Sequence, residues 1–223
     1  MDAAGRRLEF VRFALAHQVL KFGEFTVKSG RISPYFFNAG LFHSGRSVGQ
    51  LADFYAQTLM ASGVSFDMLY GPAYKGIPLA AATAISLSKA TIADRDVPFA
   101  FNRKEVKAHG EGGHLIGAPL RGRVIIIDDV ITAGTSVRES ITLIRAEGAK
   151  PAGVLIALDR MEVAGSKEAP ASHSAVEAVE QQYGIPVISI ASLDDIMQLL
   201  QETPDLAAYQ DAVADYRQRY GTR

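Results

Sequence analysis

Four consecutive β-branched residues, Val124 to Ile127, are followed at once by two carboxylates, Asp128 and Asp129. A strand with one face in water alternates apolar and polar residues, whereas an unbroken apolar run suits a strand that is covered on both faces. Such strands occur in parallel sheets that carry helices on each side. This run therefore predicts an α/β chain built around a central parallel sheet.

The rest of the chain alternates between strand-like and helix-like segments, as that architecture requires. We expect strands at Phe66–Tyr70, Phe99–Phe101, Arg123–Ile127, Val154–Leu158 and Val187–Ile190. We expect helices within Met1–Val19 and near Val48–Met60, Ile77–Ser88, Ser136–Glu147, Ser192–Leu200 and Asp205–Tyr220. Between them, Lys21–Gly45 reads as strands and turns, whereas Val106–Gly117 and Glu162–Ser174 read as mobile loops. Ligands of such sheets bind beyond the carboxyl ends of the strands, so the loops there are the places to search.

Composition narrows the class of protein. A length of 223 residues with 48% hydrophobic residues allows one domain with a sizeable core. The 23 basic and 24 acidic residues nearly balance, so no overall positive field exists to attract nucleic acid or an anionic membrane. The absence of cysteine excludes disulfides, thiolate metal sites and a cysteine nucleophile. No apolar run reaches the roughly 20 residues that span a bilayer, so a cytoplasmic location is expected.

The short loop after the two carboxylates, Thr132 to Ser136, is suited to holding an anion. A helix is expected to begin there, so unpaired backbone N–H groups and the helix dipole favour negative charge. Carboxylates repel phosphate, which leaves ribose hydroxyls or a hydrated magnesium ion as partners for Asp128 and Asp129. A polar turn whose aspartates cap the helix is the simpler alternative, but it explains only one Asp and some of the hydroxyls. The arrangement therefore indicates a site for a 5-phosphorylated ribose.

The segment Val124–Ser136, VIIIDDVITAGTS, resembles the signature with which type I phosphoribosyltransferases bind 5-phosphoribosyl 1-diphosphate (PRPP). Further segments resemble the orotate phosphoribosyltransferase family: Lys21–Gly40, Gly71–Ala80, Phe101–Gly113 and Leu158–Arg160. The resemblance implies a single domain, 1–223, with a central parallel sheet flanked by helices and a mobile loop. It also implies a small hood subdomain, about 1–45 plus C-terminal segments, over a core at 62–191.

The implied reaction transfers ribose 5-phosphate from PRPP to N1 of orotate, giving orotidine 5′-phosphate and diphosphate in de novo pyrimidine (UMP) biosynthesis. PRPP is expected to enter with Mg²⁺, which reaches Asp128 and Asp129 through water and has no direct protein ligand. The resemblance further implies a homodimer with active sites shared across the interface, and no nucleic-acid or membrane partner.

The resemblance assigns most site residues to PRPP. Lys28, Lys107, His109, Asp128 and Asp129 are the expected catalytic residues. The expected PRPP contacts are Lys28, Tyr74, Lys75, Arg103, Lys104, Lys107, His109, Asp128, Asp129, Val130, Ile131, Thr132, Ala133, Gly134, Thr135 and Ser136. Lys104, Lys107 and His109 would serve the neighbouring subunit, on a loop whose cations stabilise the departing diphosphate and exclude water. Related enzymes often have a cis peptide in the loop at Gly71–Gly76, and Ala73–Tyr74 is the candidate bond.

Four residues are assigned to orotate: Phe36, Phe37, Thr132 and Arg160. Neighbours on a strand point to opposite faces, so one phenyl ring could stack on the base while the other enters the core. Composition alone favours both rings as core residues. For Arg160, a planar guanidinium suits the orotate carboxylate, and the alternative is an ion pair with Asp159 or Asp128.

The residues favour a displacement at ribose C1 that depends on positioning and charge stabilisation, without a covalent intermediate on the protein. Whether Lys28 or Asp129 moves a proton is left open. Two other functions also remain: a phosphoribosyltransferase for a different base, and a PRPP-sensing regulator without turnover. A mobile basic lid argues against the sensor, because binding alone needs no lid.

Overall fold

A six-stranded sheet forms the centre of the computed structural model, which describes residues 2–27, 29–104, 115–165 and 170–222. Its strand order is β10-β7-β6-β3-β4-β5. The strands are β3 (Met68–Gly71), β4 (Phe99–Asn102), β5 (Leu115–Gly117), β6 (Arg123–Ile127), β7 (Lys150–Asp159) and β10 (Val187–Ser192). All neighbouring pairs run parallel except β4 and β5, which are antiparallel at the edge of the sheet.

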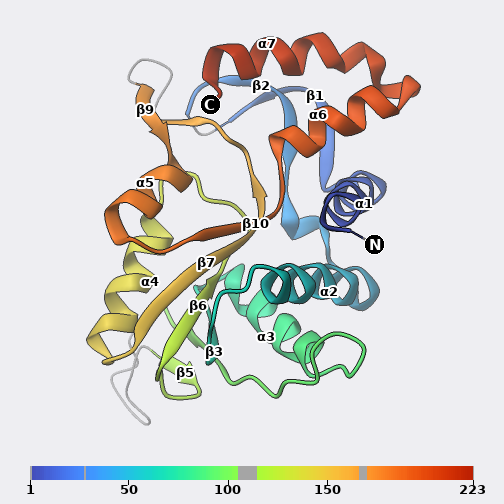
Figure 1. Cartoon of the computed structure of the whole chain (residues 1–223). Coiled ribbons are helices and arrows are strands. Elements are labelled where there is room, and N and C mark those ends of the chain that lie inside the picture. Colours follow the sequence, from blue (N-terminus) through green and yellow to red (C-terminus); the bar gives the residue numbers. More distant parts are fainter. Residues whose placement is uncertain (1, 28, 105–114, 166–169, 223) are drawn as a thin grey trace.

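Helices cover both faces of this sheet (Figure 1). One face carries α1 (Ala3–Ala16), α2 (Gly45–Ala61) and α3 (Gly76–Leu87), and the other carries α4 (Thr135–Ala146) and α5 (Ala175–Tyr183). On β6, Ile125 and Ile127 enter the core of the first face, whereas Val124 and Ile126 enter the core of the second. All four side chains are fully buried, as the unbroken apolar run predicted.

An antiparallel hairpin and the C-terminal helices lie beyond one end of the sheet (Figure 1). The hairpin consists of β1 (Leu20–Thr26) and β2 (Ile32–Phe37), followed by the short helix η1 (Ala39–Leu41). The C-terminal elements are α6 (Leu193–Glu202), η2 (Pro204–Tyr209) and α7 (Gln210–Tyr220), and α7 contacts β2. The C-terminal helix α7 therefore packs against the N-terminal hairpin.

Two loop predictions were wrong in part. Within Glu162–Ser174, the strands β8 (Val163–Gly165) and β9 (Pro170–Ser174) form an antiparallel pair. Within Val106–Gly117, Leu115–Gly117 forms β5, while 105–114 lie outside the described residues. β5 pairs with β4, whereas β8 and β9 pair with each other, and composition alone does not reveal such backbone pairing. The last helix is also divided, since η2 precedes α7.

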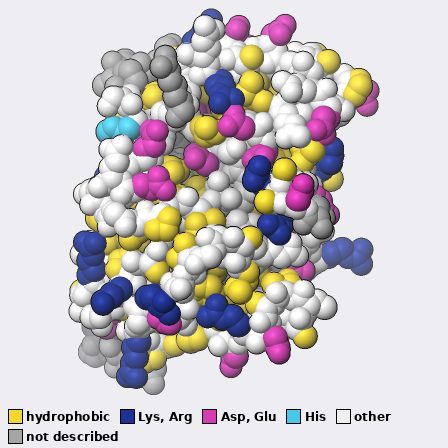
Figure 2. Space-filling view, in the orientation of Figure 1, with side chains coloured by type: hydrophobic (Ala, Val, Ile, Leu, Met, Phe, Trp, Pro, Cys, Tyr) yellow, Lys and Arg dark blue, Asp and Glu magenta, His cyan; other side chains and the backbone are white. Residues whose placement is uncertain are grey.

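Acidic and basic side chains are both distributed over the face shown in Figure 2. Hydrophobic side chains are exposed there too. Among the exposed large hydrophobic residues of the described chain, Met60 on α2 is 39% accessible and Ile85 on α3 is 66% accessible. Within the described residues, every helix is too short or too polar to cross a membrane.

Candidate active site

The carboxylates that follow β6 and the loop behind them open into one cavity of about 490 Å³. Its wall comprises residues 128–137 together with Pro72, Ala73, Tyr74 and Lys75 from the loop after β3. The strands β3 and β6 are neighbours and parallel, so their carboxyl ends bring the two loops to the same edge of the sheet. This gathers the expected PRPP residues of both loops around a single space.

The helix α4 begins behind this loop without a side-chain cap. Its N-cap residue is Gly134, whose φ of +69° lies in the left-handed region that favours glycine. Neither Asp128 nor Asp129 caps the helix, so the simpler interpretation of the two aspartates as caps is wrong. The first N–H groups of α4 therefore remain available to an anion.

The two carboxylates are in different environments. Asp129 is 6% exposed, and its Oδ2 accepts a hydrogen bond of 2.7 Å from the ammonium of Lys75, which is half exposed. Asp128 accepts from the backbone N–H of Asp129, and burial together with repulsion from Asp129 raises its pKa to about 6. Lys75 thus holds the carboxylate of Asp129, and its half-exposed side chain also lines the cavity.

Backbone contacts fix this pair of aspartates to the core. The buried hydroxyl of Tyr55 on α2 donates to the carbonyl of Asp128 at 2.8 Å. The N–H of Ala157 on β7 donates to the carbonyl of Asp129 at 2.9 Å. The backbone that carries both carboxylates is therefore held in place, and such preorganisation favours charge stabilisation in a reaction.

The loop after β3 contains a cis peptide bond between Ala73 and Tyr74, as expected. The Oδ1 of Asn102 accepts from the N–H of Ala73 at 2.8 Å, and the ammonium of Lys104 lies 4.9 Å from the centre of the Tyr74 ring. The side chain of Tyr74 is 66% accessible. The loop is thus held from β4 and presents Tyr74 to the outside.

A second cavity, of about 380 Å³, collects all four expected orotate residues. Phe37 is buried in the core, while Phe36 is half buried and stacks on Phe25 with ring centres 5.4 Å apart. Both rings line the cavity, with Phe37 the more deeply buried of the two, and stacking of a base on either ring stays a prediction. Thr132 and Arg160 line the same cavity.

The comparisons with known proteins agree with this geometry. Residues 41–186 match the phosphoribosyl transferase domain. An orotate phosphoribosyltransferase of Bordetella avium is 68% identical over 213 residues, which are 96% of this chain and 97% of that protein. This chain belongs to the orotate phosphoribosyltransferase family.

Solved structures place the fold in the same family. An orotate phosphoribosyltransferase of Francisella tularensis matches with a TM-score of 0.85 and 45% identity, over 96% of this chain and all of that chain. One from Mycobacterium tuberculosis, crystallised with 5-phospho-α-D-ribosyl 1-diphosphate, matches with a TM-score of 0.60. It is 19% identical and covers 85% of this chain and 98% of its own, so it supports the fold alone.

The structure does not place every residue that the family resemblance assigned to PRPP. Lys28, Lys107 and His109 lie outside the described residues. Arg103 follows β4 and is half buried, but it lines neither of the two cavities. Their contacts with PRPP stay predictions.

Arg160 forms an ion pair, but with neither of the two acids that the sequence analysis named as alternative partners. Its partner is Glu162, at 2.7 Å, and neither Asp159 nor Asp128. Asp159 lines the same cavity as Arg160 and accepts from the N–H of Met161, and burial raises the pKa of its carboxyl. Sequence reasoning missed Glu162 in this orotate phosphoribosyltransferase, and its position two residues after Arg160 was the available signal.

Two glycines allow the loop after β3 to pack closely enough for this site. A Cβ on Gly71 would lie 2.1 Å from the carbonyl oxygen of Gly76, and a Cβ on Gly76 would lie 2.8 Å from that of Ile127. We expect Gly71→Ala to displace the loop, destabilise the fold by about 1–3 kcal/mol and raise the KM for PRPP. Urea denaturation and steady-state kinetics measure the two effects.

Gly49→Ala is the matched control. A Cβ at Gly49, inside α2, meets nothing within 4 Å, and helix propensity favours alanine by about 0.5–1 kcal/mol. The control should therefore keep full activity and a slightly higher stability. Equal behaviour of the two variants would contradict the close-packing argument.

Proposed function

We propose that this chain transfers ribose 5-phosphate from PRPP to N1 of orotate, giving orotidine 5′-phosphate and diphosphate in de novo pyrimidine biosynthesis. The observation that carries the proposal is that the two cavities share a wall. Lys75 and the run Asp129–Thr132 line both the cavity at the helix N-terminus and the cavity beside Phe36. A phosphorylated sugar in the first and a planar base in the second would meet along Asp129, where C1 of the ribose would lie.

The chemistry follows from this placement. The N–H groups and hydroxyls at Thr132–Ser136 bind the 5-phosphate, and Asp128 and Asp129 accept hydrogen bonds from the ribose hydroxyls. The bond from C1 to the diphosphate oxygen breaks as N1 of the orotate anion bonds to C1, so the leaving electron pair stays on diphosphate. The carboxylate of Asp129 faces the positive charge that develops on the ribose. Where N1 arrives protonated, Lys28 and Asp129 are the two candidates for moving that proton.

Magnesium fits the donors of this site as a companion of PRPP. Mg²⁺ prefers oxygen ligands and commonly uses one or two carboxylates together with substrate phosphates. Asp128 and Asp129 supply such oxygens, and within the described residues no group of three acidic or histidine side chains could hold a metal alone. When bound, the ion neutralises part of the diphosphate charge. Lys75 and Arg103, with Lys104, Lys107 and His109 of a partner subunit, supply the remaining positive charge.

A direct assay separates this proposal from the two alternatives. The purified chain is mixed with PRPP, Mg²⁺ and orotate, and the absorbance of orotate is followed. Consumption of orotate that requires Mg²⁺ supports the proposal. Turnover with a purine and none with orotate would identify a phosphoribosyltransferase for another base, and PRPP binding without turnover of any base would identify a sensor.

We also propose a cytoplasmic homodimer in which residues 1–45 and the C-terminal segments act as a hood over the 62–191 core. The exposed apolar side chains of Met60 and Ile85 on α2 and α3 support a contact surface between two subunits.

Lys107→Ala and Asp129→Asn should each be nearly inactive, because each removes a charge from the shared site. Mixed heterodimers should regain activity, since one site of each pair is then intact.

Activity of the mixture is measured after the two variants have been unfolded and refolded together, with each variant refolded alone as the control. Heterodimers that form without any recovery of activity would show that the lysine acts within its own subunit.

A further inference from the structure

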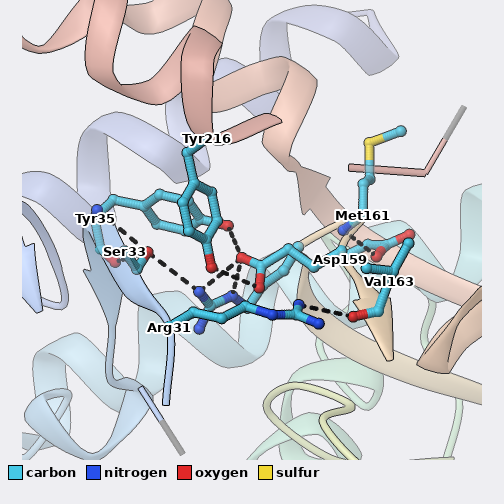
Figure 3. Close-up of polar contacts among 9 residues, drawn as sticks. Arg31, Ser33, Tyr35, Asp159, Met161, Val163 and Tyr216 are labelled. Carbon is cyan, nitrogen blue, oxygen red and sulfur yellow. Dashed lines mark hydrogen bonds and ion pairs between the residues drawn. The ribbon is translucent and has the colours of Figure 1, made fainter. Parts of the chain in front are cut away.

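The cavity of about 380 Å³ beside Phe36 is proposed above to hold the base, and we call it the base cavity. A buried polar cluster adjoins it where the hairpin, the end of β7 and the last helix meet. It consists of Ser33 and Tyr35 on β2, Arg160 and Glu162 after β7, and Tyr216 on α7, and we call it the Glu162 cluster. Figure 3 shows the hydroxyl ends of Tyr35 and Tyr216 converging from opposite elements. The side chains of Arg160 and Glu162 are 15% and 13% exposed, so both ions are largely removed from water.

The guanidinium of Arg160 is held by one edge. Its Nε and Nη2 donate to Oε1 of Glu162 at 2.9 and 2.7 Å, and Nη2 also approaches the hydroxyl of Ser33 at 3.4 Å. The guanidinium carbon lies 5.0 Å from the centre of the Tyr35 ring. The contacts with Glu162 and Ser33 do not use Nη1, and Arg160 lines the base cavity. Glu162 thus occupies the Nε and Nη2 edge of the guanidinium, and the Nη1 amino group is left for a ligand.

Glu162 is fixed from two further directions. Its Oε1 accepts from the hydroxyl of Tyr35 at 2.9 Å, and its Oε2 accepts from the hydroxyl of Tyr216 at 3.1 Å. Burial raises the pKa of both phenols, that of Tyr216 to about 12, so both are donors at neutral pH. A carboxylate with four donors in a buried place has one stable orientation, and it imposes that orientation on Arg160.

The C-terminal end of the chain closes the same region. The N–H of Thr222 donates to the carbonyl of Met161 at 2.7 Å, and Gly221 forms an isolated antiparallel bridge with Glu162. On the hairpin side, Arg31 donates to the carbonyls of Val163 and Gly165. The segment that carries Arg160 and Glu162 is therefore held between β2 and the end of α7, rather than by the sheet alone.

We propose that Glu162 is a positioning residue for the base site. It holds the Nε and Nη2 edge of Arg160 so that Nη1 faces the cavity and can donate to the carboxylate of the base. Because Tyr216 on α7 donates to Glu162, the orientation of Arg160 also depends on the last helix. The helix thus contributes to recognition of the base without touching it. The inference rests on the proposed function, because it assumes a base that carries a carboxylate.

The test is Glu162→Gln, which keeps the shape and removes the charge. We expect the KM for orotate to rise about tenfold to a hundredfold, because charge-assisted hydrogen bonds are lost and Arg160 is free to turn. The KM for PRPP and the kcat should stay within about twofold. Inhibition by uracil, which lacks the carboxylate, should be unchanged, whereas a general loss of structure would weaken uracil and orotate alike.

Tyr216→Phe removes one donor from α7 and should raise the KM for orotate alone, by a smaller factor. Tyr209→Phe is its control, since it removes a hydroxyl from the same hood, where Tyr209 stacks on Phe22; its KM should not change. If Glu162→Gln does not fold, the comparison of these two variants decides.

An unchanged KM for orotate in a folded Glu162→Gln variant would overturn the inference, as would an equal rise for PRPP. In either case a wild-type chain that consumes orotate leaves the proposed function standing. A wild-type chain that never consumes orotate would instead reject the proposed function.

Discussion

Asp129→Asn is expected to lower kcat by about 10²–10³-fold while the protein stays folded. Asp129 is the carboxylate that lines both cavities, and its Oδ2 is held 2.7 Å from the ammonium of Lys75. Asparagine keeps the size of the side chain but removes the negative charge that faces the ribose. It also leaves the ammonium of Lys75 without its counter-charge. Because the lost negative charge faces the positive charge that develops on the ribose during the reaction, we expect the chemical step to slow more than substrate binding weakens.

Single-turnover kinetics with saturating PRPP and orotate isolate that step. Asp205→Asn makes the same chemical change on the exposed surface of η2 and should keep the wild-type rate. A thermal scan of both variants verifies that they are folded. If Asp129→Asn retained a third or more of the wild-type rate, the placement of ribose C1 beside Asp129 would be wrong.

The parts of the fold that could be predicted are those that local pattern determines. Val124–Ile127 specified a strand covered on both faces because each of its side chains must find an apolar neighbour. The helix expected near Ser192–Leu200 forms as α6, and the N–H of Ser192 at its start donates to the carboxylate of Asp195 at 2.8 Å. The strand β5 has three residues and exists because the edge of β4 offers it a partner, so no pattern within Leu115–Gly117 predicts it.

The candidate site divides in the same way. Tyr74, Lys75 and the run that ends at Ser136 were found because each loop is contiguous, and parallel topology then places the two loops together. The partner of Arg160 could not be found from the residues beside it. Its choice of Glu162 over Asp159 depends on hydroxyls that arrive from β2 and α7, far away in the sequence. Acidic residues and loops that are contiguous in the chain can therefore be predicted from the sequence, but the orientation of a buried charged side chain cannot.

Asp128→Asn is expected to stabilise the ligand-free protein at neutral pH while impairing activity. The pKa of Asp128 is raised to about 6 by burial and by Asp129, against about 3.9 for a free aspartate. A raised carboxyl pKa contributes stability that is fully present below the unfolded pKa and is lost as the pH rises through 6. The ionised carboxylate therefore destabilises the fold above that pH, by about 1–3 kcal/mol, and asparagine removes this cost.

Urea denaturation at several pH values measures the effect. The difference in unfolding free energy between the variant and the wild type should be small at pH 4 and should grow between pH 4 and pH 6.5. A difference that did not change with pH would mean that Asp128 titrates normally in the folded state. The unfolded and folded pKa values of Asp128 together set the pH range over which this free-energy difference changes. A general change in packing would not depend on pH in that range.

The same ionisation should appear in substrate binding with the opposite sign. Ribose hydroxyls and a hydrated magnesium ion favour the charged form of Asp128, so the affinity for PRPP with Mg²⁺ should fall about tenfold per pH unit below pH 6. The phosphate of PRPP titrates near the same pH, but Asp128→Asn retains that contribution, so the difference in slope between variant and wild type belongs to Asp128. Binding of the substrate then relieves the repulsion that destabilises the empty site. The added stability of the ligand-free variant and its lost affinity for PRPP are thus two consequences of one buried charge.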